Sequence, residues 1–277
     1  MRYYFAPMEG LTDSIYRREH HRFFGGVDRY CMPFFSPTVH RTFTSRETRE
    51  LPNADSVPFC AVPQVLTNDP ENFLWAAEAC RDLGYAEINL NAGCPSGTVV
   101  AKRKGSGMLR DLDSLASFFD RIFAKSPLPV SVKTRLGMEE PEEFEKILAL
   151  YNRYPIRELI VHPRVRRQFY EGQVHSEWFA YAAQNSRNPL CYNGDVRSLA
   201  DILALEEAYP PASRRDDRQG TDYRSGNALR RHGNWHIGSL PERPDGRLHR
   251  RILRLPERAV PDEGKLGLSA QSVCWQR

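Results

Sequence analysis

Two kinds of segment alternate along residues 1–209, and this alternation constrains the fold more than any other feature of the sequence. Short runs rich in β-branched and aromatic residues are typical of buried strands. Seven such runs occur, at residues 3–8, 29–34, 59–65, 86–91, 129–135, 158–162 and 189–193. Longer segments with apolar residues three and four apart predict amphipathic helices between several of them, as at residues 70–84, 112–124, 141–154 and 198–209. We therefore expect an α/β protein.

The number of repeats favours a (β/α)8 TIM barrel over an open doubly wound sheet. In such barrels the functional residues lie at the carboxyl ends of the strands. Polar residues follow six of the predicted strands, at Glu9, Gln64, residues 89–94, Lys133 and Arg135, His162 and Arg164, and residues 193–195. One polar residue at a strand end is ordinary loop chemistry. Six in register predict a single functional site.

Cysteine spacing and hydropathy argue against several classes of protein. The six cysteines form no CxxC pair and have no histidine at ligand spacing, so neither a disulfide framework nor a metal site is predicted. The first residues lack the basic region and apolar run of a signal peptide, and no stretch approaches the roughly 20 apolar residues of a membrane span. We expect a soluble, cytoplasmic protein with no membrane partner. Nothing in the sequence specifies an oligomer, and a monomer is expected.

The most specific segment is EINLNAGCPSGTVVAKRKGSGML, at residues 87–109. It is joined, in order and spacing, by APMEGLTD, the glutamine of VPQV, VKTRLG, VHPR and NGD. Over about residues 3–209 this set of motifs resembles the tRNA-dihydrouridine synthases. The resemblance implies that FMN lies across the barrel mouth and is reduced by a nicotinamide cofactor, NADPH or NADH. Hydride would then pass from N5 of FMN to C6 of a uridine in tRNA.

Cys94 is the catalytic residue that the resemblance implies, as the donor of a proton to C5 of the uridine. A thiol with a reference pKa near 8.5 is mostly protonated at neutral pH, so it can act as an acid without special tuning. Gly93 and Pro95 would hold it on a tight loop. The alternative is that Cys94 is one more small core residue.

Several residues would bind the cofactor. Lys133 shares a strand face with Ser131 and Arg135, and its charge could stabilise the reduced, anionic flavin at N1 and O2. A solvated lysine is the alternative. His162 would contact flavin by resemblance, although a histidine that donates to a neighbouring carbonyl is the ordinary case. The family usually has glycine where this chain has Pro163.

The remaining assignments concern the flavin ring, the phosphate and the RNA. Gln64 can donate and accept at once, which suits the pyrimidine-like edge of the ring. By resemblance, the backbone shelf under the ring is formed by Pro7, Met8 and Glu9. The phosphate site would begin at Asn193, Gly194 and Asp195, where glycine permits close backbone approach. The residues that resemble substrate and RNA contacts are Asn91, Lys102, Arg135 and Arg164. Lys102 by itself could equally be a solvated surface lysine.

The composition changes near residue 210. Residues 210–277 hold 14 Lys and Arg against 8 Asp and Glu, and they contain none of the 14 phenylalanines or 5 methionines. The family pattern requires an eighth strand with a glycine-rich phosphate-binding turn here, followed by a helical RNA-binding domain. The sequence of this segment matches neither. Residues 214–222 can be encoded so that reading one base later gives Ala-Val-Met-Ile-Gly-Arg-Gly-Leu, which matches the missing strand and turn.

We therefore expect residues 1–209 to be an FMN-binding TIM-barrel catalytic domain that is incomplete, and residues 210–277 to be an out-of-frame, disordered tail. A basic RNA-binding arm is the alternative for the tail. Without an eighth strand, strands one and seven would lack their shared neighbour and flavin would be held weakly. Two other functions stay open: another FMN-dependent pyrimidine oxidoreductase, such as dihydroorotate dehydrogenase, or an inactive RNA-binding pseudoenzyme.

Overall fold

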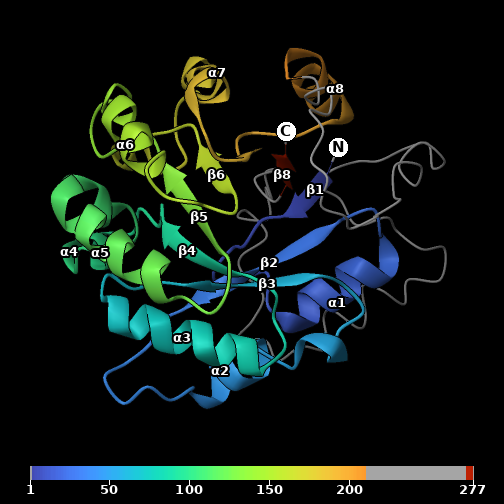
Figure 1. Ribbon diagram of the computed structural model, residues 1–277. Coiled ribbons are helices and arrows are strands. Elements are labelled where there is room, and N and C mark those ends of the chain that lie inside the picture. Colours follow the sequence, from blue (N-terminus) through green and yellow to red (C-terminus); the bar gives the residue numbers. More distant parts are fainter. Residues whose placement is uncertain (1, 210–272, 277) are drawn as a thin grey trace, which may run out of the picture.

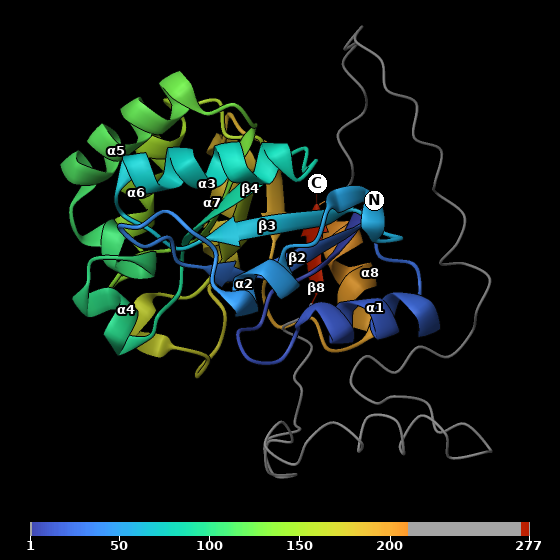
Figure 2. The ribbon, with the colours of Figure 1, turned by 90° about the horizontal axis from the view of Figure 1, so that it is seen from below.

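The computed structural model describes residues 2–209 and the backbone of residues 273–276. Strands in sequence order roll into a closed barrel with helices outside it (Figures 1 and 2). Seven of them run parallel: β1 (Arg2–Phe5), β2 (Arg29–Phe35), β3 (Ala61–Val65), β4 (Ile88–Ala92), β5 (Val130–Arg135), β6 (Leu159–His162) and β7 (Leu190–Tyr192). The predicted barrel with seven strand and helix repeats is confirmed.

The helices between the strands cover the outside of the barrel (Figure 1). They are α1 (Ser14–Phe23), α2 (Ser45–Glu50), α3 (Pro70–Asp82), α4 (Gly97–Ala101), α5 (Leu112–Lys125), α6 (Glu143–Tyr151), α7 (Ser176–Asn185) and α8 (Leu199–Ala208). Short 3-10 turns lie at η1 (Ala54–Ser56), η2 (Gly105–Arg110) and η3 (Arg166–Gln168). None of the helices in this described part of the chain is long and apolar enough to span a lipid bilayer.

The position between β1 and β7 is filled by β8 (Val273–Gln276), which runs antiparallel to both neighbours. Arg2 of β1 pairs with Gln276, and Tyr192 of β7 pairs with Trp275. The expectation that these two strands lack a shared neighbour is therefore wrong, because β8 supplies hydrogen-bonding partners for both exposed edges. Unlike the eighth strand of a complete (β/α)8 barrel, β8 is not parallel to its neighbours. The rest of the predicted tail, residues 210–272 and 277, lies outside the described residues.

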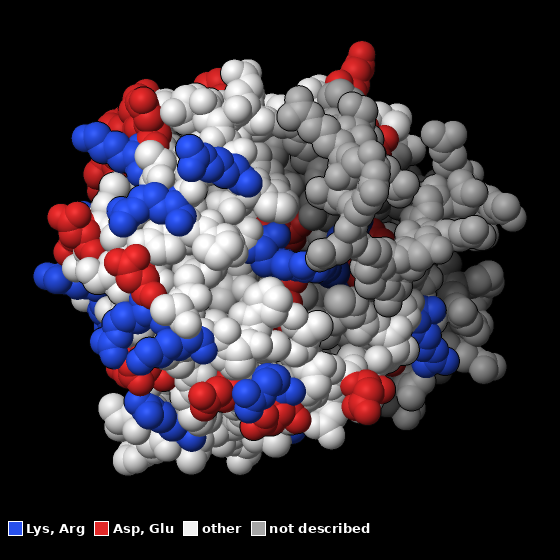
Figure 3. Space-filling view, viewed as in Figure 1, with Lys and Arg blue, Asp and Glu red and all other residues white. Residues whose placement is uncertain are grey.

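Buried apolar side chains between the strands and the helices hold the barrel together. Apolar residues between strands and helices form the main core, and Phe73, Phe119 and Phe144 are all 0% exposed. Caps define where the covering helices begin: Asp69 accepts from the amides at the start of α3, and Asp111 does so for α5. On the described part of the face in Figure 3, Lys and Arg are interspersed with Asp and Glu, and no large area carries one charge.

A buried ion cluster lies at the amino end of the barrel strands. Arg29 donates to Glu87 at 2.9 Å and lies 4.0 Å from Glu158, which also accepts from the Tyr4 hydroxyl at 3.1 Å. Glu158 is 2% exposed. Burial, opposed in part by Arg29, raises the pKa of Glu158 to about 7. Its protonation therefore changes at near-neutral pH.

Glu158→Gln is expected to flatten the pH dependence of stability between about pH 4.5 and 7. In the wild type the folded state keeps a proton that the unfolded chain has released, so stability is lost as the pH rises through this window. The loss is up to about 3 kcal/mol. Urea unfolding at four pH values measures it, with the exposed Glu140→Gln as the control. Equal pH slopes for Glu158→Gln and the wild type would contradict the assignment.

Candidate active site at the carboxyl ends of the strands

The register of the sheet brings the predicted site residues together. Gln64 pairs with Asn89, Asn91 with Lys133, and Arg135 with His162, along four consecutive strands. These side chains therefore share the edge of the barrel at which the parallel strands end.

A chain of amide hydrogen bonds crosses this edge. Gln64 Nε2 donates to Asn89 Oδ1, Asn91 Nδ2 donates to Gln64 Oε1, and Asn89 Nδ2 donates to Ser131 Oγ, each at 2.8 Å. All four side chains are buried. Because Gln64 uses one N–H and one lone pair inside the chain, one donor and one acceptor remain for a ligand.

Cys94 lies on a loop that is held by its backbone. Asn91 Oδ1 accepts from the amides of Gly93 and Cys94, and the amide and hydroxyl of Ser106 both donate to the Cys94 carbonyl at 3.0 Å. Gly105 has φ +56°, and a Cβ there would come within 2.7 Å of the same carbonyl. The thiol is free and half-buried. None of these contacts uses the sulfur, so it is available for chemistry.

His162 is neutral in this environment. It is 5% exposed, and burial, followed by the charges of Arg135, Lys133 and Arg164, holds its pKa well below the usual range. Arg164 Nη1 lies 3.1 Å from His162 Nε2. A guanidinium only donates, so Nε2 accepts and the ring proton resides on Nδ1. The alternative that His162 donates to a neighbouring carbonyl therefore does not hold for Nε2, which accepts a hydrogen bond.

Arg135 is directed inward, with 1% of its surface exposed. Its Nε donates to the Gly93 carbonyl at 2.9 Å and its Nη1 to the Val165 carbonyl at 3.0 Å. Burial lowers its pKa to about 10, so it stays charged at neutral pH. Arg135 therefore connects the Cys94 loop to the loop that follows β6 through hydrogen bonds to both.

Arg164 is equally buried and forms a two-pronged ion pair with Asp195. Nη1 and Nη2 each lie 2.7 Å from one carboxylate oxygen, and Nη2 also donates to the Gly172 carbonyl at 2.7 Å. This contact lowers the pKa of Asp195. Arg164 Nε–H has no partner among the described residues. The predicted RNA contacts Arg135 and Arg164 are therefore internal side chains here.

The predicted phosphate residues follow β7. The backbone amide of Asn193 donates to the Val161 carbonyl at 2.9 Å, and the backbone amide of Val196 donates to the Gly194 carbonyl at 2.9 Å. A Cβ at Gly194 would overlap the ring of Tyr192. Packing against Tyr192 therefore requires glycine at position 194. The Asp195 carboxylate forms an ion pair with Arg164.

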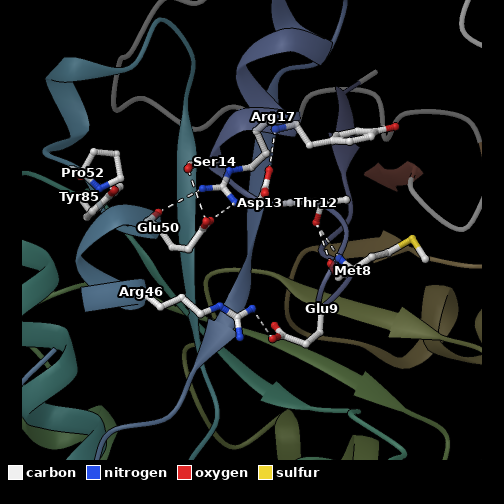
Figure 4. Close-up of polar contacts among 11 residues, drawn as sticks. Met8, Glu9, Thr12, Asp13, Ser14, Arg17, Arg46, Glu50, Pro52 and Tyr85 are labelled. Carbon is white, nitrogen blue, oxygen red and sulfur yellow. Dashed lines mark hydrogen bonds and ion pairs between the residues drawn. The ribbon is translucent and has the colours of Figure 1, made fainter. Parts of the chain in front are cut away.

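The loop after β1 carries the predicted shelf. Pro7 and Met8 are half-buried, and Glu9 is exposed and pairs with Arg46 at 2.7 Å. The Met8 carbonyl accepts from the Thr12 amide, and the Thr12 hydroxyl accepts from the Met8 amide at 2.9 Å (Figure 4). These bonds close the loop into a compact turn.

A buried ion pair that sequence reasoning missed supports this turn. Arg17 of α1 is 1% exposed and donates to the Thr12 carbonyl at 2.8 Å and to Glu50 Oε2 at 3.2 Å (Figure 4). The signal in the sequence was a Thr-Asp-Ser helix start, with Asp13 as the cap of α1. The partner Glu50 is 33 residues away, so no local pattern identifies it.

Lys102 is exposed, just beyond α4, and its carbonyl accepts from Asn68 Nδ2 at 3.1 Å. It is followed by the exposed Arg103, which has φ +54° and which sequence reasoning also missed. These two cations lie near the Cys94 loop in the chain and, unlike Arg135 and Arg164, are accessible.

These residues fit the ring of a flavin better than its phosphate. The amide edge of Gln64, the half-buried Lys133, the neutral His162 and the unpaired Nε–H of Arg164 supply a buried set of donors and acceptors. The residues predicted to bind the phosphate offer less, because the carboxylate of Asp195 is itself an anion and pairs with Arg164. No group of three His, Cys, Asp or Glu side chains in the described residues could hold a metal ion.

The fold and the site together define an α/β barrel with a polar, thiol-bearing site at the carboxyl ends of its strands. A family model described as dihydrouridine synthase (Dus) matches residues 4–208. The chain belongs to the dihydrouridine synthase family, as its motifs predicted.

Curated relatives agree with this family. The chain is 30% identical over 205 residues to a probable tRNA-dihydrouridine synthase of Rickettsia bellii, covering 73% of this chain and 62% of the relative. It is 29% identical over 209 residues to a tRNA-dihydrouridine(16) synthase of Neisseria meningitidis, with coverage of 73% and 62%. A tRNA-dihydrouridine(16) synthase of Pseudomonas putida is 31% identical over 216 residues, with coverage of 73% and 64%. The chain thus spans about three fifths of the length of these relatives.

Proposed function

We propose that residues 1–209 form the catalytic domain of a tRNA-dihydrouridine synthase that reduces uridine in tRNA to 5,6-dihydrouridine with FMN and NADPH or NADH. The observation that carries this proposal is the half-buried Cys94 thiol, on a loop held by backbone contacts, together with the buried amide and histidine side chains and the half-buried Lys133 at the same edge of the barrel. The names of the relatives supply the substrate.

The residues have distinct roles in this proposal. Bound FMN would supply hydride to C6 of the uridine. Cys94 delivers a proton from its thiol to C5 as a general acid. Asn91 holds the loop that carries this thiol, through the amides of Gly93 and Cys94.

Several further groups bind the cofactor in this proposal. Gln64 presents its remaining N–H and lone pair to the pyrimidine-like edge, and Lys133 places a positive charge beside it. His162 offers Nδ1–H as a donor. Pro7, Met8 and Glu9 provide the shelf, and the backbone of residues 193–195 begins the phosphate site.

Arg135 and Arg164 act in the proposal as positioning residues because both are buried and bonded to main-chain carbonyls. Lys102 contacts the RNA backbone. Residues 210–277 are proposed to be translated out of frame, which sequencing of the gene across codons 200–225 would decide.

The proposal is tested with the purified chain, FMN and unmodified tRNA. We expect FMN to bind weakly enough to be lost during gel filtration, because the described residues hold its ring more fully than its phosphate. Without oxygen, NADPH oxidation beyond the amount needed to reduce the added FMN should require tRNA, and mass spectrometry should find dihydrouridine. Oxidoreduction with orotate or dihydroorotate in place of tRNA, or no flavin binding at all, would contradict the proposal.

A further inference from the structure

The loop between β6 and α7 carries an exposed aromatic ring beside the Cys94 loop. Phe169 is 41% exposed and the neighbouring Tyr170 is 56% exposed. Arg166 lies between Phe169 and the Cys94 loop: its Nε donates to the Pro95 carbonyl at 3.2 Å, and its guanidinium lies 5.0 Å from the centre of the Phe169 ring. The ring is thus held close to the thiol-bearing loop through one cationic side chain.

The backbone at Phe169 is strained. Its φ of 51° and ψ of −100° lie outside the regions that residues with a side chain prefer. Hydrogen bonds maintain the turn, since the Phe169 amide donates to the Arg166 carbonyl at 3.1 Å and Gln168 Oε1 accepts from the Val165 amide at 2.9 Å. A large apolar ring that is held partly in water by a strained backbone is better suited to contact with a ligand than to core packing.

One cation, Arg166, lies against the ring and also contacts the segment that carries two more. A Cβ at Gly97, the first residue of α4, would lie 4.0 Å from Arg166 Nη2, so α4 begins beside the Arg166 side chain. Five residues later the chain exposes Lys102 and Arg103. An aromatic surface bordered by cations matches a stacked base with its phosphates.

The reaction itself creates a need for such a surface. A nucleotide that leaves its stack to reach a half-buried thiol exposes the face of the adjacent base. An aromatic side chain at the entrance can cover that face, and a guanidinium behind the ring strengthens the contact.

We propose that Phe169, backed by Arg166, stacks on the RNA base adjacent to the uridine that enters the site. This inference rests on the proposed function, because it takes tRNA as the substrate. The ring is a binding surface for an unpaired base and takes no part in proton transfer.

The test compares Phe169→Gly with Phe169→Trp. Glycine removes the ring and relieves the positive φ, so the melting temperature should stay the same or rise. The dissociation constant for unmodified tRNA, measured by fluorescence anisotropy, should increase about 5- to 100-fold, as expected for the loss of one stacked base. Phe169→Trp should retain the wild-type affinity, and saturating tRNA should quench its fluorescence more than that of the wild type. Leu203→Ala, which removes an exposed apolar side chain on α8, is the control and should change neither quantity.

The possible results separate the stacking proposal from the proposed function. If Phe169→Gly binds tRNA as tightly as the wild type, or if tRNA does not alter the added indole fluorescence, the stacking surface is refuted while the proposed function stands. If the wild type itself binds no tRNA, both proposals fail. Loss of FMN affinity in Phe169→Gly, with tRNA affinity unchanged, would also refute the stacking role and assign the ring to the cofactor.

Discussion

Cys94→Ala is expected to lower the rate of dihydrouridine formation by about 100- to 10,000-fold, the range that a positioned general acid contributes. The contacts that hold its loop come from Asn91 and Ser106 and involve only main-chain atoms of residue 94. Removal of the sulfur should therefore leave the FMN affinity and the urea midpoint nearly unchanged. Rates are measured by mass spectrometry of tRNA with FMN and NADPH in excess.

Cys60→Ala is the matched control for Cys94→Ala, because Cys60 is an exposed free cysteine that immediately precedes the start of β3. It should have the wild-type rate. Cys94→Ser should remain strongly impaired, since a hydroxyl is a much weaker acid than a thiol. Equal rates for Cys94→Ala and the wild type would show that the proton comes from another group.

Arg164→Met is expected to destabilise the protein by about 3 kcal/mol, which is typical when one partner of a buried ion pair is removed. The variant leaves the Gly172 carbonyl without its donor, leaves Asp195 with the exposed Arg197 at 3.3 Å as its ion-pair partner, and removes the donor to His162 Nε2. Urea unfolding at pH 7 measures the loss. The exposed pair of Arg167 and Glu140 provides the control, because Arg167→Met should change stability by less than about 1 kcal/mol.

The effect of Arg164→Met also depends on pH in a known direction. Arg164 lowers the pKa of Asp195 in the folded state. The contribution of the pair is therefore present above the unfolded pKa of Asp195 and is lost as the pH falls through its lower folded value. The stability difference between wild type and Arg164→Met should shrink in acid. A difference that is constant from pH 7 to pH 3 would show that packing, and not the ion pair, is the main term.

Much of the fold could be predicted because strand and helix patterns are local. The predicted strand at residues 129–135 is β5, and the predicted helix at residues 70–84 is α3, each within two residues. The first strand ends earlier than predicted, at Phe5, because the chain turns where the Met8 carbonyl accepts the Thr12 amide. Helix α1 was not predicted because it has few apolar residues, and the residue that it buries is Arg17.

The candidate site was predicted as a set of residues but not as an arrangement. The positions of Gln64 and Lys133 at strand ends follow from the alternation. That Arg135 and Arg164 are internal could not be read from the sequence, since an arginine near a strand end is exposed in most proteins. The exposed ring of Phe169 depends on a backbone conformation that no residue type predicts.

The sequence by itself determined the alternation of strands and helices and the order of chemical groups at the strand ends, because both depend on residues within a few positions of one another. Only the tertiary structure decided how those groups are used. The amide chain joins Gln64 to Asn89 across 25 residues and Asn89 to Ser131 across 42, and β8 joins the barrel from the far end of the chain. Such partners are chosen by strand register and barrel closure, which arise when distant segments pack together.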